Sequence, residues 1–206
     1  MKFLIDTSAA KLANQHSKLI AGQLLTPLTN YRNWGGVFAM DNGAFAGFDR
    51  KKFFRLLERN LQQIDQCLFV TVPDIVGNAK RTRELYFHFT QNEQMKPYAD
   101  KWSFVMQDGI ENERIEWYAL RHVFIGGSDS FKDSSDAHDI VRTAKALDVP
   151  VHVGRVNCWK RYKAYADLGA DTCDGSGIAK YDYMMRDIEK YLAQAQVSKN
   201  QKELFA

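Results

Sequence analysis

Short apolar runs rich in β-branched and aromatic residues recur along the chain, and most are followed by a turn residue and a longer segment of helical period. Nearly continuous apolar runs of this kind are typical of parallel strands that are covered on both faces. Eight segments fit the pattern: KFLID, QLLTPL, GVFAMD, CLFVTVPD, WSFVMQDG, HVFIGG, VPVHVGR and ADTCDG.

Amphipathic stretches separate these runs and predict helices. Eight β/α units indicate an α/β fold, a (β/α)8 TIM barrel, which needs roughly 200 to 250 residues. We therefore expect a single barrel domain over residues 1–206, with 197–206 as a loose tail. An open, doubly wound sheet is the alternative, because QLLTPL is weak as a strand and no convincing helix follows it. The expected helices lie in KKFFRLLERNLQQI, NAKRTRELYFHFTQN, DAHDIVRTAKAL, NCWKRYKAYADLG and YDYMMRDIEKYLAQAQ.

Composition narrows the class of protein. Of the residues, 45% are apolar and 26% are charged, as in an ordinary globular domain, and the net charge of +3 neither establishes nor excludes nucleic-acid binding. No apolar run approaches the roughly 20 residues of a membrane helix, and the first residues do not resemble a secretory signal. The three cysteines, Cys67, Cys158 and Cys173, show no metal-ligand spacing, so we expect no zinc site, no disulfide framework and a cytoplasmic setting.

Polar residues and glycines follow the predicted strands. In parallel α/β folds the carboxyl ends of the strands form the active site, so acids there predict a catalytic pocket. Taken one at a time, the same residues can also be explained as helix caps or as parts of short loops. Asp6 fits a helix cap, and Asp108 could begin a helix around ENERIEWY. The strand-end residues are Asp6, Asp41, Asn42, Gly43, Asp74, Gln107, Asp108, Gly109, Gly126, Gly127, Ser128, Gly154, Arg155, Asp171 and Asp174.

The ordered motifs MDNGAF, VPDIVG, VMQDG, FIGGS and GADTCDG resemble those of the tRNA-guanine transglycosylase superfamily. The chain is most similar to the short phage and bacterial branch that inserts 7-deazaguanines into DNA, in which IGGSDSFK and HVGRVNCWKR have counterparts. The resemblance spans about residues 36 to 180. It implies a barrel that exchanges guanine in a polynucleotide for a free 7-deazaguanine, such as 7-cyano-7-deazaguanine, without a metal or other cofactor.

The resemblance assigns catalytic roles to two acids. Asp174 matches the nucleophile that attacks the sugar C1′ and forms a covalent glycosyl-enzyme intermediate. Asp41 matches the second carboxylate, which exchanges a proton with the departing and incoming bases, and Asn42 could hold it. Asp171 is the rival nucleophile, but the period of a strand turns it toward the helix layer or the loop if Asp174 faces the barrel mouth.

Further residues would bind the base. Asp74 and Gln107 match positions that contact the Watson–Crick edge of guanine, and the backbone N–H groups of Gly126 and Gly127 would face its carbonyl oxygen. Phe45 matches a stacking aromatic, with Gly154 or Val153 on the opposite side of the base. Packing in the core is the alternative for Phe45.

The chain departs from the tRNA-acting members because it lacks their zinc subdomain. We therefore expect duplex DNA with a flipped guanine as the partner, with tRNA as the less favoured substrate and a homodimer left open. The same acids would also suit a retaining nucleosidase or glycosidase, or a barrel that binds a base without catalysis. Basic residues near the rim predict phosphate contacts, although the helix beyond residue 160 in WKRYK fits a solvated face with aromatics turned inward. These basic residues are Lys132, Arg155, Lys160 and Lys180.

Overall fold

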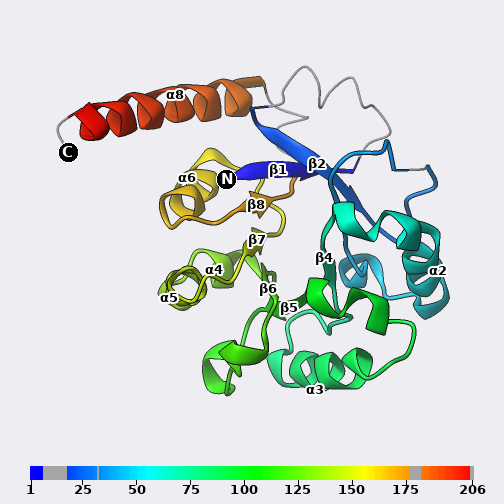
Figure 1. The fold of residues 1–206 in the computed structure, drawn as a ribbon. Coiled ribbons are helices and arrows are strands. Elements are labelled where there is room, and N and C mark those ends of the chain that lie inside the picture. The colour runs from blue at the N-terminus through cyan, green and yellow to red at the C-terminus, as the bar shows by residue number, and fades with distance from the viewer. Residues whose placement is uncertain (7–17, 32, 177–181, 205–206) are drawn as a thin grey trace.

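Eight parallel strands form a closed barrel in a computed structural model that describes residues 1–6, 18–31, 33–176 and 182–204 (Figure 1). The strands follow one another in chain order, and β8 pairs with β1 to close the ring. The predicted TIM barrel is therefore confirmed, and the open sheet is excluded. The strands are β1 (Lys2–Ile5), β2 (Ile20–Leu25), β3 (Phe38–Met40), β4 (Cys67–Thr71), β5 (Trp102–Met106), β6 (His122–Ile125), β7 (Val151–Val153) and β8 (Thr172–Cys173).

Helices lie outside the ring of strands (Figure 1). Several helices are capped by the side chain of the residue that precedes them. Asp49 accepts a hydrogen bond from Lys52 N, and Asn78 accepts one from Arg81 N. The α-helices are α2 (Arg50–Asn60), α3 (Ala79–Thr90), α4 (Asp129–Lys132), α5 (Ser135–Ala146), α6 (Trp159–Asp167) and α8 (Asp182–Leu204), and the 3₁₀ helices are η1 (Ala44–Ala46), η2 (Leu61–Gln66), η3 (Lys96–Lys101), η4 (Ile110–Asn112) and η5 (Trp117–Ala119).

The core has two layers because successive side chains of a strand point to opposite faces. A large cluster between the strands and the helices includes Phe3 and Val151, whereas a small cluster includes Leu4 and Phe69. Polar groups share the interior with the small cluster, since the buried His122 stacks on Phe69 at 4.2 Å between ring centroids. The strand faces therefore bring buried imidazoles into the middle of the barrel.

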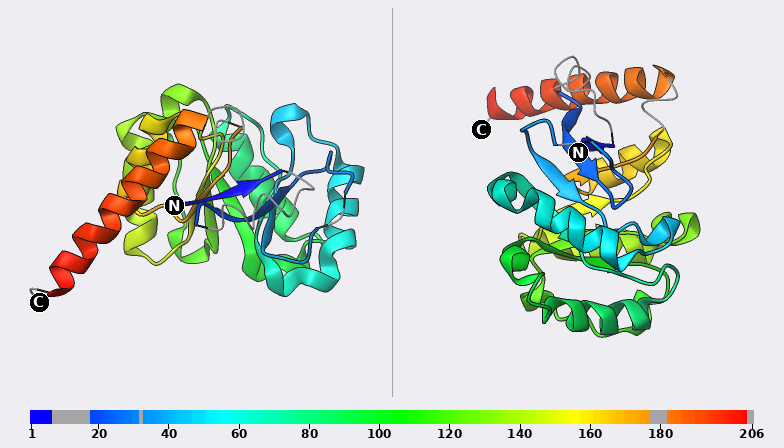
Figure 2. Two further views of the ribbon diagram at one scale, coloured as in Figure 1. Left: turned by 90° about the horizontal axis from the view of Figure 1, so that it is seen from above. Right: turned by 90° about the vertical axis from the view of Figure 1, so that its right-hand side faces the viewer.

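Three segments differ from the sequence-based expectation. Strand β2 begins at Ile20 and ends before Pro27, which has no N–H to donate to a sheet, and no helix is described between β2 and β3. The short 3₁₀ turns η4 and η5 replace the helix expected around ENERIEWY. The loose tail expected at 197–206 is wrong for residues 197–204, because they belong to α8, which extends past the barrel (Figure 2); residues 205 and 206 lie outside the described residues. In the described ranges, no helix is long and apolar enough to span a membrane.

Candidate active site

A pocket lies at the carboxyl ends of the strands, where the sequence predicts the site. It encloses about 490 Å³ of empty space, and it is lined by residues from six of the eight strands or from the loops that follow them. The lining brings together most of the predicted residues: Asp41, Asn42, Phe45, Asp74, Gly126, Gly127, Gly154, Arg155 and Asp174, joined by Ala44, Thr71, Val76, Val105 and Phe124.

Asn42 holds Asp74 in place. The buried Asn42 amide donates to Asp74 Oδ1 at 2.8 Å and to Val72 O at 2.9 Å, and its Oδ1 accepts from Ala44 N at 2.7 Å. The expected bond from Asn42 to Asp41 is therefore corrected, because the amide is turned toward β4. This residue links the loop after β3 to the carboxylate after β4.

Gln107 lies behind Asp74 and is not among the pocket-lining residues. Its Nε2 donates to Asp74 Oδ2 at 3.3 Å, to Ile75 O and to Thr82 Oγ1, while its Oε1 accepts from Gly77 N at 2.7 Å. The side chain is buried, and both ends of its amide are engaged by the protein. The structure thus places Gln107 as a residue that positions Asp74, and not in direct contact with the pocket as expected.

The two carboxyls on this side hold their protons more tightly than ordinary aspartates. Burial, together with the negative charges of Asp174 and Asp74, raises the pKa of Asp41 to about 7. Burial also raises the pKa of Asp74, although hydrogen bonds from Asn42 and Gln107 oppose the rise. Asp41 can therefore donate a proton near neutral pH and accept it back.

Asp174 lies on the other side of the pocket and has a different environment. Its Oδ1 accepts from His152 Nε2 at 3.0 Å and from the Arg155 backbone N at 3.0 Å. Its Oδ2 makes no hydrogen bond to any residue described, and the side chain is 20% exposed. One oxygen is thus fixed while the other remains available for attack.

His152 was missed by the sequence analysis. It is fully buried, and its Nδ1 lies 2.9 Å from Thr172 Oγ1. A carboxylate only accepts hydrogen bonds, so in the neutral ring Nε2 bears the proton for Asp174 and Nδ1 accepts from the Thr172 hydroxyl. The alternation of VHV in β7, which turns the histidine inward between two outward valines, was the signal for it.

Asp171 has a structural role on the outside of the barrel. It accepts from Lys145 Nζ on α5 at 2.8 Å and from Val151 N at 2.8 Å. The expectation that it faces the helix layer, away from Asp174, is confirmed.

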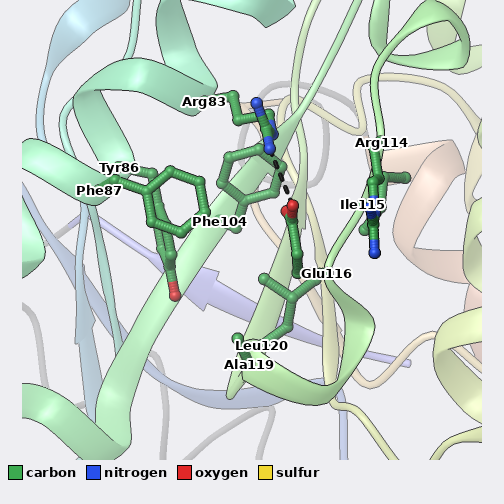
Figure 3. Close-up of a pocket in the computed structure, with 9 residues that line it drawn as sticks. All are labelled: Arg83, Tyr86, Phe87, Phe104, Arg114, Ile115, Glu116, Ala119 and Leu120. Atoms are coloured by element: carbon green, nitrogen blue, oxygen red, sulfur yellow. Dashed lines mark hydrogen bonds and ion pairs between the residues drawn. The ribbon is translucent and has the colours of Figure 1, made fainter.

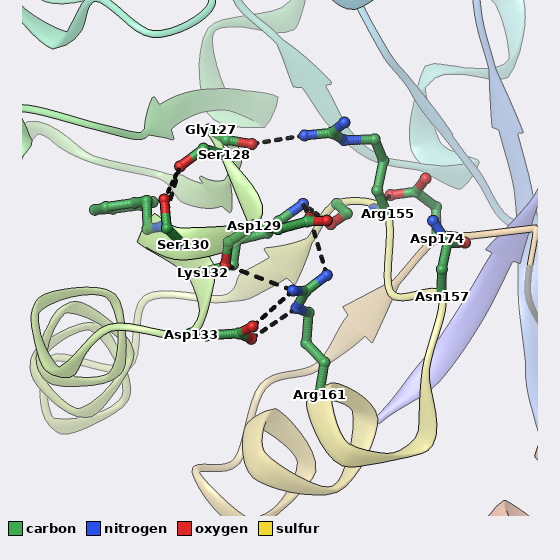
Figure 4. A network of polar contacts seen from close by, with 12 residues as sticks. Gly127, Ser128, Asp129, Ser130, Lys132, Asp133, Arg155, Asn157, Arg161 and Asp174 are labelled. Atoms are coloured by element: carbon green, nitrogen blue, oxygen red, sulfur yellow. Dashed lines mark hydrogen bonds and ion pairs between the residues drawn. The ribbon is translucent and has the colours of Figure 1, made fainter.

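Phe45 and Arg155 meet at the mouth of the pocket. The Phe45 ring is 68% exposed, which excludes packing in the core, and the Arg155 guanidinium lies 4.1 Å from its centroid. Arg155 Nη2 also donates to Gly127 O at 2.6 Å (Figure 4). A base stacked on this face of the ring would have to displace the guanidinium.

The two glycines after β6 are not equivalent. The N–H of Gly126 donates to Met106 O at 2.9 Å, so its expected contact with a base carbonyl is corrected. Gly127 has a φ of 73°, and a Cβ there would lie 2.4 Å from Asp108 Oδ2. Its N–H makes no hydrogen bond within the part of the chain described.

Thr71 is a further lining residue that the sequence analysis did not single out. It is 1% exposed, and its Oγ1 has no hydrogen-bond partner among the residues described. A buried hydroxyl without a partner is costly, so a ligand in the pocket would supply one.

The predicted phosphate contact of Lys132 is wrong. This side chain is fully buried, and its Nζ donates to Gly154 O at 3.2 Å and lies 3.3 Å from Asp129 Oδ1 (Figure 4). Helix α4 turns it inward, where it holds the turn after β7. Lys160 is exposed on α6, as expected, and Lys180 lies outside the described residues.

The acids and bases around Lys132 are paired with one another. Arg161 binds Asp133 through two nitrogens at 2.9 Å and Asp129 at 3.0 Å (Figure 4). The Asp108 carboxylate accepts from the backbone N of Ser128 at 2.7 Å, at the start of α4, so it supports this helix and not the expected one after β5. Tyr162 is buried, in agreement with aromatics turned inward on α6.

A second cavity lies between α3 and the segment before β6 (Figure 3). It encloses about 280 Å³ of empty space and is lined mainly by apolar side chains, among them Phe87 and Ile115. Its charged pair, Arg83 and Glu116, is joined by a 2.8 Å ion pair. This cavity contains none of the strand-end acids.

Comparisons with known proteins give no assignment: no family model matches the chain, and neither does any curated protein.

Proposed function

We propose that the protein is a DNA-guanine transglycosylase that replaces guanine in DNA with a 7-deazaguanine through a covalent aspartyl intermediate. The observation that supports this most is the pairing of two unlike carboxyls in one pocket. Asp41 has a pKa near 7, and Asp174 has one oxygen held by two donors and the other without a partner among the described residues. An acid that can supply a proton beside a fixed carboxylate nucleophile suits a double displacement at a glycosidic carbon.

In the first step, Asp174 Oδ2 attacks the sugar C1′. The C1′–N9 bond breaks, its electron pair goes to the base, and Asp41 gives the departing guanine a proton. In the second step, Asp41 takes the N9 proton of the incoming 7-deazaguanine, whose N9 attacks C1′ and releases the Asp174 carboxylate. Asp41 thereby regains the proton that it gave up in the first step, and no other reactant is consumed.

Both bases present the same polar edge to the pocket. The Asp74 carboxylate would accept from N1–H and the exocyclic amine, and the Gly127 N–H would donate to O6. Thr71 Oγ1 would gain the partner it lacks among the described residues. Phe45 would stack on the ring once the Arg155 guanidinium moves aside.

The direct test is mass spectrometry of nucleosides from DNA and from tRNA, each incubated with the protein and several free 7-deazaguanines. We expect a modified deoxynucleoside from DNA. Modification of tRNA alone would replace DNA as the substrate, and guanine release without an incoming base would favour a retaining nucleosidase. Binding of a 7-deazaguanine with no covalent adduct would instead indicate a non-catalytic barrel.

Replacement of Asp174 by Asn should abolish exchange, with a loss of at least about 10³-fold in rate, because the nucleophile is removed while Oδ1 can still accept its hydrogen bonds. The same assay measures it, together with denaturing electrophoresis of the protein–DNA adduct. Asp171→Asn is the matched control, since that acid is paired with Lys145 outside the barrel. Exchange by Asp174→Asn at the wild-type rate would overturn the mechanism.

A further inference from the structure

Helix α2 presents a strongly basic surface. Five of its eleven residues are exposed Arg or Lys side chains, and its only exposed acid is Glu58. We define the cationic face of α2 by its basic residues: Arg50, Lys51, Lys52, Arg55 and Arg59.

The placement of these charges is unfavourable for the helix itself. Three of them form the first turn, which contains no acidic residue, although the partial positive charge at the N-terminal end of a helix repels cations. Within the described ranges, only Lys52 of this face has an acidic partner, Asp49 at 3.7 Å. Elsewhere among the described residues, exposed cations such as Lys96, Arg142 and Lys163 are paired with nearby acids. The cationic face is thus left open to an anion.

A groove runs along this face. It lies between α2 and residues 26–30, encloses about 510 Å³ of empty space, and is lined by Lys52, Arg55 and Arg59 together with Thr26 and Asn30. No helix is described between β2 and β3, and among the described residues it is the loop after β2 that lines the groove opposite α2. Cations beside hydroxyl and amide groups suit phosphate oxygens.

The groove adjoins the active site. Residues 41–49 connect β3 to α2, so the same loop that bears Asp41 and Phe45 leads directly into the basic first turn. On the other wall, Pro27 packs against Gly43, where a Cβ would lie 3.0 Å from Pro27 Cδ. An extended polymer with one residue in the pocket would therefore pass close to the groove.

We infer that the cationic face of α2 and its groove bind the phosphodiester backbone of the nucleic acid whose base enters the pocket. This rests on the proposed function, and it replaces the contact expected from Lys132. Each cation that neutralises a phosphate releases a counterion, so the interaction must weaken as salt rises.

The test compares two triple variants with the same loss of charge. Lys51→Gln/Lys52→Gln/Arg55→Gln alters the cationic face but spares Arg50, which lies over the Phe54 ring, and Arg59, which donates to Thr29 O. The control, Lys96→Gln/Arg142→Gln/Lys163→Gln, removes three cations from ion pairs elsewhere. Glutamine is a good helix former, so both variants should fold.

Fluorescence anisotropy with a duplex DNA of about 20 base pairs and, separately, with tRNA gives the dissociation constants over a salt series of about 50 to 200 mM. On the preferred nucleic acid we expect the α2 variant to bind at least about 10-fold more weakly at low salt, with a slope of log Kd against log salt reduced by about 2 to 3. The control variant should change the dissociation constant and the salt slope far less.

Equal losses in the two variants, or none in either, would overturn the inference, even with wild-type base exchange intact. Absence of exchange and of a covalent adduct in the wild-type protein would contradict the proposed function instead, whatever its affinity for DNA. The two failures are therefore distinguishable.

Discussion

The two sides of the pocket use the same residue type in opposite ways. On the side built by β3 and β4, Asp41 and Asp74 are crowded together, and burial raises the pKa of both. On the side built by β7 and β8, Asp174 receives two hydrogen bonds on one oxygen, from His152 and from the Arg155 backbone. In the proposed mechanism, the surroundings of the two carboxyls, and not their residue type, decide which one carries the proton and which one is the nucleophile.

The difference also separates what each side must do in the proposed exchange. A proton carrier must change its charge readily, so its proximity to two other acids is useful. A nucleophile must keep its orientation, and the donors on Oδ1 of Asp174 fix the carboxylate while Oδ2 has no partner among the described residues. Substitutions on the Asp41 side and on the Asp174 side of the pocket should therefore impair catalysis in different ways.

After the loss of the nucleophile in Asp174→Asn, the largest effect is expected when Asp41 is replaced by Asn. The change removes the proton carrier at nearly constant shape and should lower the exchange rate by about 10²- to 10⁴-fold. In the wild type, the step that expels guanine needs protonated Asp41 and should slow as pH rises above about 7. This decline should vanish from the residual activity of Asp41→Asn, as single-turnover rates from pH 5 to 9 would show.

The same variant should be more stable at high pH. The pKa of Asp41 rises on folding from 3.8 to about 7, so the folded chain binds more protons than the unfolded chain in this range. The wild type therefore loses stability as pH increases through the range, and Asp41→Asn does not. Melting temperatures should diverge toward pH 8, by about 2–4 °C per kcal/mol in a chain of this size. Parallel pH dependence in both proteins would contradict the raised pKa.

The position of the acids was predictable from the sequence because parallel strands bring their carboxyl ends to one rim. Asp41, Asp74 and Asp174 each follow an apolar run, and all three line the pocket. The alternation within β8 also separated Asp174 from Asp171 correctly. In a closed barrel the carboxyl end of every strand faces the same opening. The order of the strands and the alternation within each strand are therefore enough to locate these acids.

Contacts between distant segments were not predictable in the same way. Lys132 looks like an exposed residue of a basic motif, but α4 has only four residues and turns its ammonium to Gly154 O, 22 positions away. Gln107 follows β5 as predicted, but its amide binds Asp74 and the loop after β4, and the side chain does not line the pocket as expected. Side-chain direction at the ends of short helices and strands depends on tertiary packing, which the periodic pattern does not encode.

A smaller effect is expected from His152, which positions Asp174. His152→Phe removes a hydrogen bond to a charged group, worth about 1.5–3 kcal/mol, so formation of the covalent adduct should slow by about 10- to 150-fold. Because His152 does not line the pocket, KM for the free base should stay unchanged while kcat falls. His152→Gln can keep a donor and should restore part of the rate.

The control for His152 is His122→Phe, the same change at another buried imidazole in the barrel. His122 Nδ1 lies 2.9 Å from Ser103 Oγ, and His122 makes no hydrogen bond to Asp174 in the described structure. Both variants should lose thermal stability, but only His152→Phe should slow adduct formation. Equal slowing in the two would mean that His152 acts only through packing.

The smallest effect is expected at Thr71, which lines the pocket and has no partner for its hydroxyl among the described residues. Thr71→Val keeps the shape and removes the unsatisfied group, so the melting temperature of the empty protein should not fall. If the Thr71 hydroxyl forms a hydrogen bond to a bound base, calorimetry should show that the affinity of Thr71→Val for the free base falls by about 2- to 10-fold.

Thr82→Val is the control, because Thr82 Oγ1 accepts from Ile75 N at 3.1 Å and from Gln107. It should reduce stability and loosen Asp74. Unchanged base affinity in Thr71→Val would mean that the bound base makes no hydrogen bond to the Thr71 hydroxyl.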